Sequence, residues 1–138
     1  MRAHAPKLAI ALAATALVAG GAALQAKPKL TPEQRLEKLL EGREAGKPVS
    51  CISLADSRDL EILDGVALVY RSGSTLYVNR PRNPEDLDSD DVLVTRPSGS
   101  QLCRLDMVHT VDRTSYFITG FINLGDFVPY RKVKPADK

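Results

Sequence analysis

Alternation of apolar and polar residues is the main pattern of the chain from residue 49 onward, and it predicts β-strands. The alternating runs are short, and turn residues such as Asp64-Gly65 and Ser72-Gly73-Ser74 separate them. The runs lie at residues 49–54, 60–63, 66–71, 75–80, 92–95, 107–111, 117–123 and 127–133, with a further strand near Cys103. We therefore expect a mainly β fold, either a small antiparallel barrel or a curled sheet of six to eight short strands.

A single short amphipathic helix is expected before the strands. Thr31 is a suitable N-cap, Pro32 suits the first helical position, and Gln34 would complete a capping box. The apolar stripe consists of Leu36, Leu39 and Leu40. The helix should end near Gly42 or Gly46. Its narrow stripe fits a helix that covers an open sheet face, and docking on a partner is the less favoured alternative.

The first 26 residues have the pattern of a secretory signal peptide. Arg2 and Lys7 precede an uncharged apolar run, and small residues follow as far as Ala26. We expect cleavage after Ala23 or Ala26, because the many Ala and Gly residues make the run too weakly hydrophobic to favour an uncleaved anchor. The expected organisation is a signal peptide at 1–26, a linker and short helix at 27–48, a β domain at 49–133 and a disordered tail at 134–138.

The charge balance argues against a nucleic-acid partner. The 138 residues include 19 basic and 17 acidic side chains, and Arg2 and Lys7 are the charged residues of the leader. Removing the leader leaves 17 basic against 17 acidic residues, so the mature chain is neutral. Nucleic-acid binders need a positive surface that displaces counterions. We expect no nucleic-acid partner, and no stable membrane span after cleavage.

The two cysteines, Cys51 and Cys103, both lie in the mature part of the chain. Exported proteins usually pair an even number of cysteines, so we expect a Cys51–Cys103 disulfide. The alternative is two buried free thiols. No C-x-x-C redox motif is present. The expected location is the periplasm or the extracellular space.

An acidic run at residues 83–91 is a weak candidate for a cation site. Its candidate ligands are Asp86, Asp88 and Asp90. The run does not match a calcium-binding EF-hand loop, whose sixth position would be Asp91 instead of glycine. A solvated loop, with Arg80 and Arg82 pairing with the acids, is favoured.

His109 is the single histidine of the mature chain and shares one side of a predicted strand with Met107 and Val111. A thiol enzyme that uses Cys51 or Cys103 with His109 is possible in principle, but a disulfide would remove its nucleophile. Neither G-x-S-x-G nor a P-loop is present. The basic residues from 58 to 131 include no lysine, and their arginines suit structural ion pairs better than an anion site. We expect no enzyme activity, no metal and no cofactor.

Four segments give the chain a resemblance to a family of small exported proteobacterial proteins, grouped as a domain of unknown function. These segments are Gly46-Lys47-Pro48-Val49-Ser50-Cys51-Ile52, Tyr77-Val78-Asn79-Arg80-Pro81-Arg82, Ser98-Gly99-Ser100-Gln101-Leu102-Cys103 with Asp106, and Leu124-Gly125-Asp126-Phe127-Val128-Pro129-Tyr130. The resemblance implies a periplasmic or secreted β-rich domain and supplies no catalytic residues. Some family members carry extra cysteines near Asn83 and Ile122, which this chain lacks.

The expected function is therefore a non-enzymatic binding or structural module of the cell envelope, with an unidentified envelope component as its partner. The alternatives are a Ca²⁺- or anion-dependent binding protein and, less favoured, the thiol enzyme.

Overall fold

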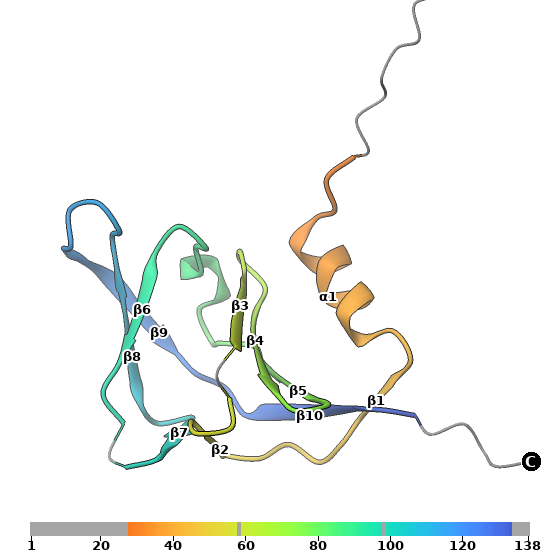
Figure 1. The fold of residues 1–138 in the computed structure, drawn as a ribbon. Coiled ribbons are helices and arrows are strands. Elements are labelled where there is room, and N and C mark those ends of the chain that lie inside the picture. Colours follow the sequence, from red (N-terminus) through yellow and green to blue (C-terminus); the bar gives the residue numbers. More distant parts are fainter. Residues whose placement is uncertain (1–27, 58, 98, 134–138) are drawn as a thin grey trace, which may run out of the picture.

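The computed structural model describes residues 28–57, 59–97 and 99–133 (Figure 1). The expected signal peptide and the expected tail lie outside these residues. The described chain is mainly β and forms three antiparallel sheets. Sheet A has the strand order β1 (Arg43–Ala45), β10 (Phe127–Lys132), β5 (Thr75–Asn79), β4 (Ala67–Ser72) and β3 (Asp59–Leu63). Sheet B pairs β2 (Cys51–Ser53) with β7 (Gln101–Cys103), and sheet C has the order β6 (Val92–Thr95), β8 (Met107–Val111) and β9 (Ile118–Asn123).

The mainly β prediction is confirmed, and of the two forms expected for it, a barrel or a curled sheet, the described strands do not form the closed barrel. The strands divide into three sheets and no barrel closes. Ten strands, more than the six to eight expected, lie in the described ranges. The unexpected strand β1 lies in the segment expected to be linker and helix, and it pairs with β10. The predicted meander through residues 60–80 is confirmed as β3, β4 and β5.

The helix α1 (Pro32–Leu40) begins as the sequence predicts. The Gln34 backbone N–H donates to Thr31 Oγ1 over 3.2 Å, and the Thr31 backbone N–H donates to Gln34 Oε1 over 2.9 Å. This capping box satisfies two backbone donors that a helix start leaves unpaired. Two ion pairs then join α1 to sheet A, Arg35 with Glu61 and Arg80 with Glu33.

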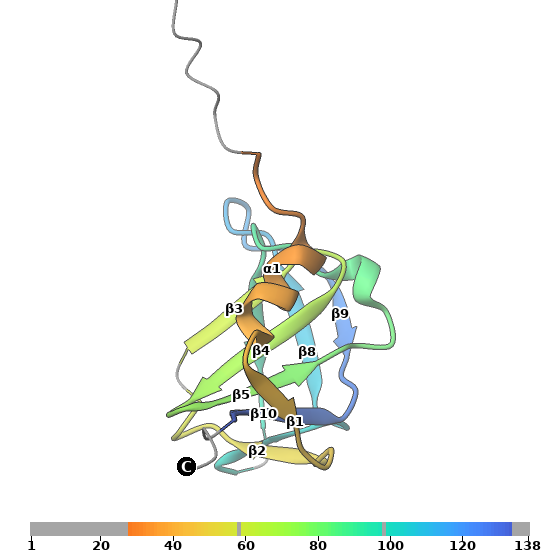
Figure 2. The ribbon, with the colours of Figure 1, turned by 90° about the vertical axis from the view of Figure 1, so that its right-hand side faces the viewer.

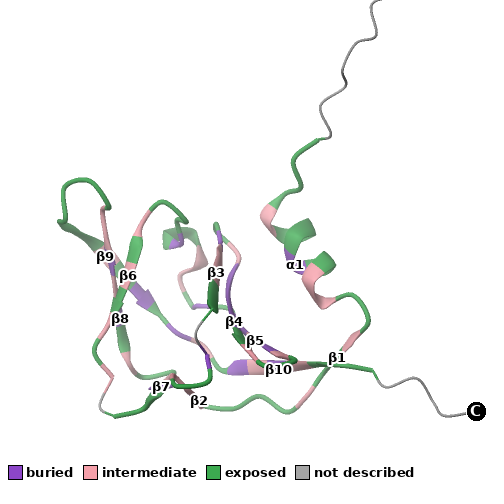
Figure 3. Cartoon of the chain, in the orientation of Figure 1, coloured by how far each residue is buried: buried purple, intermediate pink, exposed green. Residues whose placement is uncertain are grey.

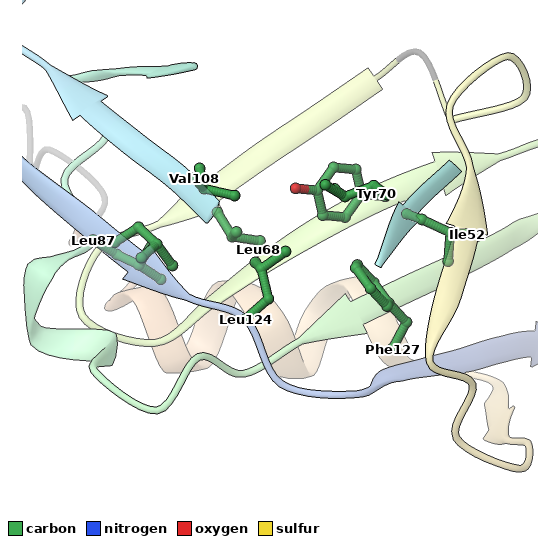
Figure 4. Packing of buried hydrophobic residues seen from close by; sticks show 9 residues of the cluster. Ile52, Leu68, Tyr70, Leu87, Val108, Leu124 and Phe127 are labelled. Carbon is green, nitrogen blue, oxygen red and sulfur yellow. The ribbon is translucent and has the colours of Figure 1, made fainter. Parts of the chain in front are cut away.

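Sheet A lies between two apolar layers (Figure 1, Figure 2). The stripe of α1 covers one face, as expected, in a cluster made of Leu36, Leu63, Ala67, Val69, Leu76 and Val78. The inner face of sheet C and residues of sheet B cover the other face. That second cluster, most of it labelled in Figure 4, consists of Ile52, Leu68, Tyr70, Leu87, Leu102, Val108, Ile122, Leu124 and Phe127. Sheet A is therefore covered on both faces, whereas only the inner face of sheet C belongs to a core cluster.

The chain crosses from sheet C to sheet A at Leu124-Gly125-Asp126, between β9 and β10, and a buried asparagine holds this crossing. The Asn79 side chain donates from Nδ2 to the Gly125 carbonyl over 2.7 Å and accepts at Oδ1 from the Gly125 N–H over 3.0 Å. Asn79 is fully buried. The side-chain amide of Asn79 thus makes the two hydrogen bonds to Gly125 that the backbone of a neighbouring strand would otherwise make.

A second asparagine binds the edge of β9 in the same way. Asn83 Nδ2 donates to the Phe121 carbonyl over 2.8 Å, and Asn83 Oδ1 accepts from the Asn123 N–H over 2.8 Å. Asn79 lies in the Tyr77–Arg82 segment on which the family resemblance rests, and Asn83 directly follows that segment. Through these hydrogen bonds the two asparagines give this part of the chain a structural role in backbone pairing.

Raising the pH through the range of tyrosine ionisation is expected to destabilise the fold through Tyr70. Its ring packs edge-on against Phe127, with centroids 5.8 Å apart. Burial raises the pKa of Tyr70 well above its ordinary value of 10.0, because the phenolate would lose its hydration. A raised folded-state pKa gives stabilisation that is complete below the unfolded pKa and is lost as the pH rises.

The free energy of unfolding should therefore fall above about pH 10, as urea denaturation at a series of pH values would measure. Tyr70→Phe carries no ionisable group and should remove most of this fall. An equally steep fall in the variant would contradict the assignment to Tyr70.

Candidate functional site

The outer face of sheet C is apolar although no layer of the described chain covers it. Strand alternation places one residue set on this face, and the register aligns that set across the three strands. The face consists of Val92 and Val94 on β6, Met107, His109 and Val111 on β8, and Ile118, Phe121 and one polar residue, Asn123, on β9. All but the half-buried His109 and Val111 are exposed. Figure 3 shows exposed stretches along the strands of sheet C. Solvent-facing positions of an antiparallel sheet are usually polar, so this face has the character of a binding surface.

A shallow groove of about 350 Å³ lies across this face, lined by Val94, Arg96, His109, Val111 and Ile118. His109 lies directly opposite Val94 on one neighbouring strand and Phe121 on the other. The sequence predicts the side shared by Met107, His109 and Val111, and the structure shows that this side is the uncovered one. The groove supplies apolar contacts together with one imidazole and the guanidinium of Arg96, a composition suited to binding.

The turn between β8 and β9 extends the face with aromatic side chains. Tyr116 and Phe117 have exposed fractions of 81% and 75%, and Ile118 follows them. Asp112 fixes this turn by accepting the N–H groups of Thr114 and Ser115 and the Ser115 hydroxyl. These bonds, those from Ser115 above all, hold the pKa of Asp112 below its ordinary value. These hydrogen bonds therefore fix the backbone of the turn that carries the two aromatic rings.

Tyr116 has a left-handed backbone, with φ of 60°. Residues other than glycine, asparagine and aspartate rarely adopt this conformation, which costs about 1–2 kcal/mol. The Tyr116 N–H donates to the Asp112 carbonyl over 2.9 Å, which keeps the residue in place. A strained backbone under an exposed aromatic ring points to a role for the ring beyond stability.

Cys51 and Cys103 form the predicted disulfide. The two residues lie directly opposite each other in sheet B, with Cα atoms 4.0 Å apart. The Arg104 N–H donates to the Ser50 carbonyl and the Leu54 N–H to the Ser100 carbonyl. These two hydrogen bonds belong to positions on either side of the cysteines, so Cys51 and Cys103 form a non-hydrogen-bonded pair. In such pairs the Cα atoms of an antiparallel ladder approach most closely.

The thiol-enzyme alternative has no nucleophile in this form of the protein. Both sulfurs are in the disulfide, and the described residues include no free cysteine. The two acidic residues nearest His109 in sequence, which could orient its ring, are bonded elsewhere. Asp106 accepts the Cys103 N–H over 2.7 Å at the turn after β7. The other, Asp112, holds the aromatic turn.

The acidic run folds into a loop around the short 3₁₀ helix η1 (Pro84–Asp86). Asp86 accepts from the Asn83 side chain, and Asp88 accepts the Asp90 N–H. The structure does not gather the candidate ligands Asp86, Asp88 and Asp90 into a metal-binding group, nor does any other set of three such side chains in the described ranges form one.

The predicted pairing of Arg80 with these acids is wrong, because Arg80 bonds Glu33 of α1 over 2.8 Å instead. No ion pair of the described residues involves Glu85, Asp86, Asp88, Asp90 or Asp91. Four of these carboxylates line a groove of about 340 Å³ together with Phe121 of the apolar face. Unpaired negative charge therefore adjoins one side of the outer face.

No helix in the part of the chain described here is long and apolar enough to cross a bilayer. Comparison with known proteins adds no relative: no family model, no curated protein and no solved structure matches this chain.

Proposed function

We propose that the protein is an exported, non-enzymatic binding module, periplasmic or secreted, whose binding surface is the outer face of sheet C. The observation that carries the proposal is the run of exposed apolar side chains across three strands that have a core on their other face only. The disulfide supports an oxidising compartment outside the cytosol.

The partner that this surface fits best is an apolar segment of another envelope protein, flanked by basic residues. Burying the exposed apolar side chains supplies the favourable free energy, and basic residues would meet the unpaired carboxylates beside Phe121. The same carboxylates disfavour an anionic lipid surface, because they would be repelled by it. A protein is therefore the occupant to which the proposal commits.

Photo-crosslinking in cells that naturally export the protein tests this proposal. A photoreactive residue at Ile118 should yield a discrete crosslinked protein, because that side chain lies within the proposed contact. A photoreactive residue at Leu60 on β3 is the matched control, since Leu60 is also exposed and apolar but lies in sheet A. Absence of a product at Ile118, or the same product at Leu60, would overturn the proposal.

A Tyr116→Gly variant separates binding from folding in the same assay. Glycine adopts the left-handed backbone without strain, so the variant should be at least as stable as the parent in thermal unfolding. It nevertheless removes the most exposed ring of the turn, and the yield of crosslinked product at Ile118 should fall severalfold.

A further inference from the structure

The two edges of sheet C differ in a way that points to self-association. At the β9 edge, the Asn83 side chain bonds the backbone of Phe121 and Asn123, and the Arg82 N–H donates to the Asn123 carbonyl. At the β6 edge, no hydrogen bond within the described residues involves the backbone of 92–95 apart from the pairing with β8. β6 contains no proline, lysine or bulge of the kind that usually protects an exposed edge.

Two copies of this open edge, placed antiparallel, are complementary in charge and in apolar character. The segment reads Asp90-Asp91-Val92-Leu93-Val94-Thr95-Arg96, with acidic residues at one end, Arg96 at the other and apolar residues between them. In an antiparallel pair of strands, residues that lie directly opposite each other point to the same face of the sheet. About a twofold axis at Leu93, Asp90 of each copy lies opposite Arg96 of the other, and Val92 opposite Val94.

We propose that two copies of the chain pair antiparallel through β6, forming one continuous sheet with three strands from each copy. Such an isologous contact uses the same edge of both copies. Two opposite-charge pairs and two valine pairs form across the axis, and each cross-strand pair of this kind stabilises a sheet. Asp90 and Arg96 are both exposed and have no ion pair within the described part of the chain, so both are free to bond a second copy.

The remaining edges of sheet A are less suited to this pairing. A twofold axis at the centre of β3 would place Glu61 opposite Glu61 of the second copy, and like charges directly opposite each other destabilise a sheet. Glu61 is also bonded to Arg35 of α1. The strand β1 has three residues only. β6 is therefore the edge that a second copy fits.

The twofold axis is perpendicular to the sheet, so both outer faces lie on the same side of the dimer. The apolar face then continues across the contact from one copy to the other. The dimer contact uses the backbone of the β6 edge and the side chains of Asp90, Val92, Val94 and Arg96, of which Val94 and Arg96 also line the groove on the outer face. The inference goes beyond the proposed function, and photo-crosslinking at Ile118, a residue outside the contact, tests that function separately.

Sedimentation equilibrium on the exported protein, with its disulfide intact, tests the inference. The parent should be dimeric at about 50 µM. Arg96→Glu alone would place Glu opposite Asp90, and Asp90→Arg alone would place Arg opposite Arg96. Each variant should therefore weaken dimerisation by about tenfold or more.

An equal mixture of the two variants provides the decisive measurement. In the mixed pair, Asp90 faces Arg96 at one end of the contact, and the introduced Arg faces the introduced Glu at the other. Heterodimers should therefore recover the parental affinity. The matched control, Arg82→Glu, changes an exposed arginine away from β6 and should leave dimerisation unchanged.

A parent that stays monomeric at that concentration would overturn the inference, as would a dimer unaffected by Arg96→Glu or a mixture that stays monomeric. Thermal unfolding of each variant shows whether it is folded, so a loss of association can be separated from a loss of structure. Photo-crosslinking at Ile118 to a different protein would still occur if the dimer alone were wrong.

Discussion

Removing the disulfide by the double substitution Cys51→Ala and Cys103→Ala is expected to lower the free energy of unfolding by about 4 kcal/mol. The two cysteines are 52 residues apart in sequence, and opening a loop of this length restores much conformational freedom to the unfolded chain. Ile52 and Leu102, next to the cysteines, are buried in the main core cluster. Sheet B would consequently lose the covalent link that holds its two short strands in register.

Urea denaturation of the parent and the double variant, each with and without reductant, measures this effect. Reductant should destabilise the parent by a similar amount and leave the double variant unchanged. A loss below about 1 kcal/mol would show that the pairing of β2 with β7 is stable without the covalent link.

The second large effect is expected at the chain crossing. Asn79→Ala should destabilise the protein by about 3 kcal/mol, because it leaves the N–H and carbonyl of the half-buried Gly125 without the partner that the fully buried Asn79 supplies. Asn83→Ala is the matched control. Asn83 makes the same kind of paired bonds to β9, but it is only half-buried, and water can replace it. Its loss should cost about 1 kcal/mol.

Gly125→Ala tests the same crossing by changing the other residue of the contact. A Cβ at Gly125 would lie 2.5 Å from the Arg80 backbone carbonyl oxygen, so one of the two segments would have to move. Combining Gly125→Ala with Asn79→Ala should cost less than the sum of the two single losses, because both disturb one contact. Chemical denaturation of the four proteins measures the coupling, and strict additivity would show that the two residues act independently.

Local signals in the sequence predicted the local structure well. The capping box of Thr31 and Gln34, the turn at Asp64-Gly65 and the bounds of β6 depend on residues close together in the chain, and the structure confirms all three. The Cys51–Cys103 pairing was predictable because two cysteines allow one intramolecular bridge.

The division into sheets depends on contacts between distant residues and was not predictable. β1 is short and polar, and it is a strand because β10 lies beside it. The crossing at Gly125 depends on Asn79, which lies 46 positions earlier. Alternation along β8 also cannot indicate which face is covered. The covered face is set by sheet A, which packs on the side of Val108 and leaves His109 on the outer side.

The position of β10 has a consequence for the order in which the molecule can form during synthesis. β10 comes last among the strands along the chain, yet it lies inside sheet A between β1 and β5. Until the ribosome has made this segment, β1 has no neighbour in the sheet, and Phe127 is missing from the core. The nascent chain therefore cannot complete sheet A, or the core that includes Phe127, before its last strand has been synthesised.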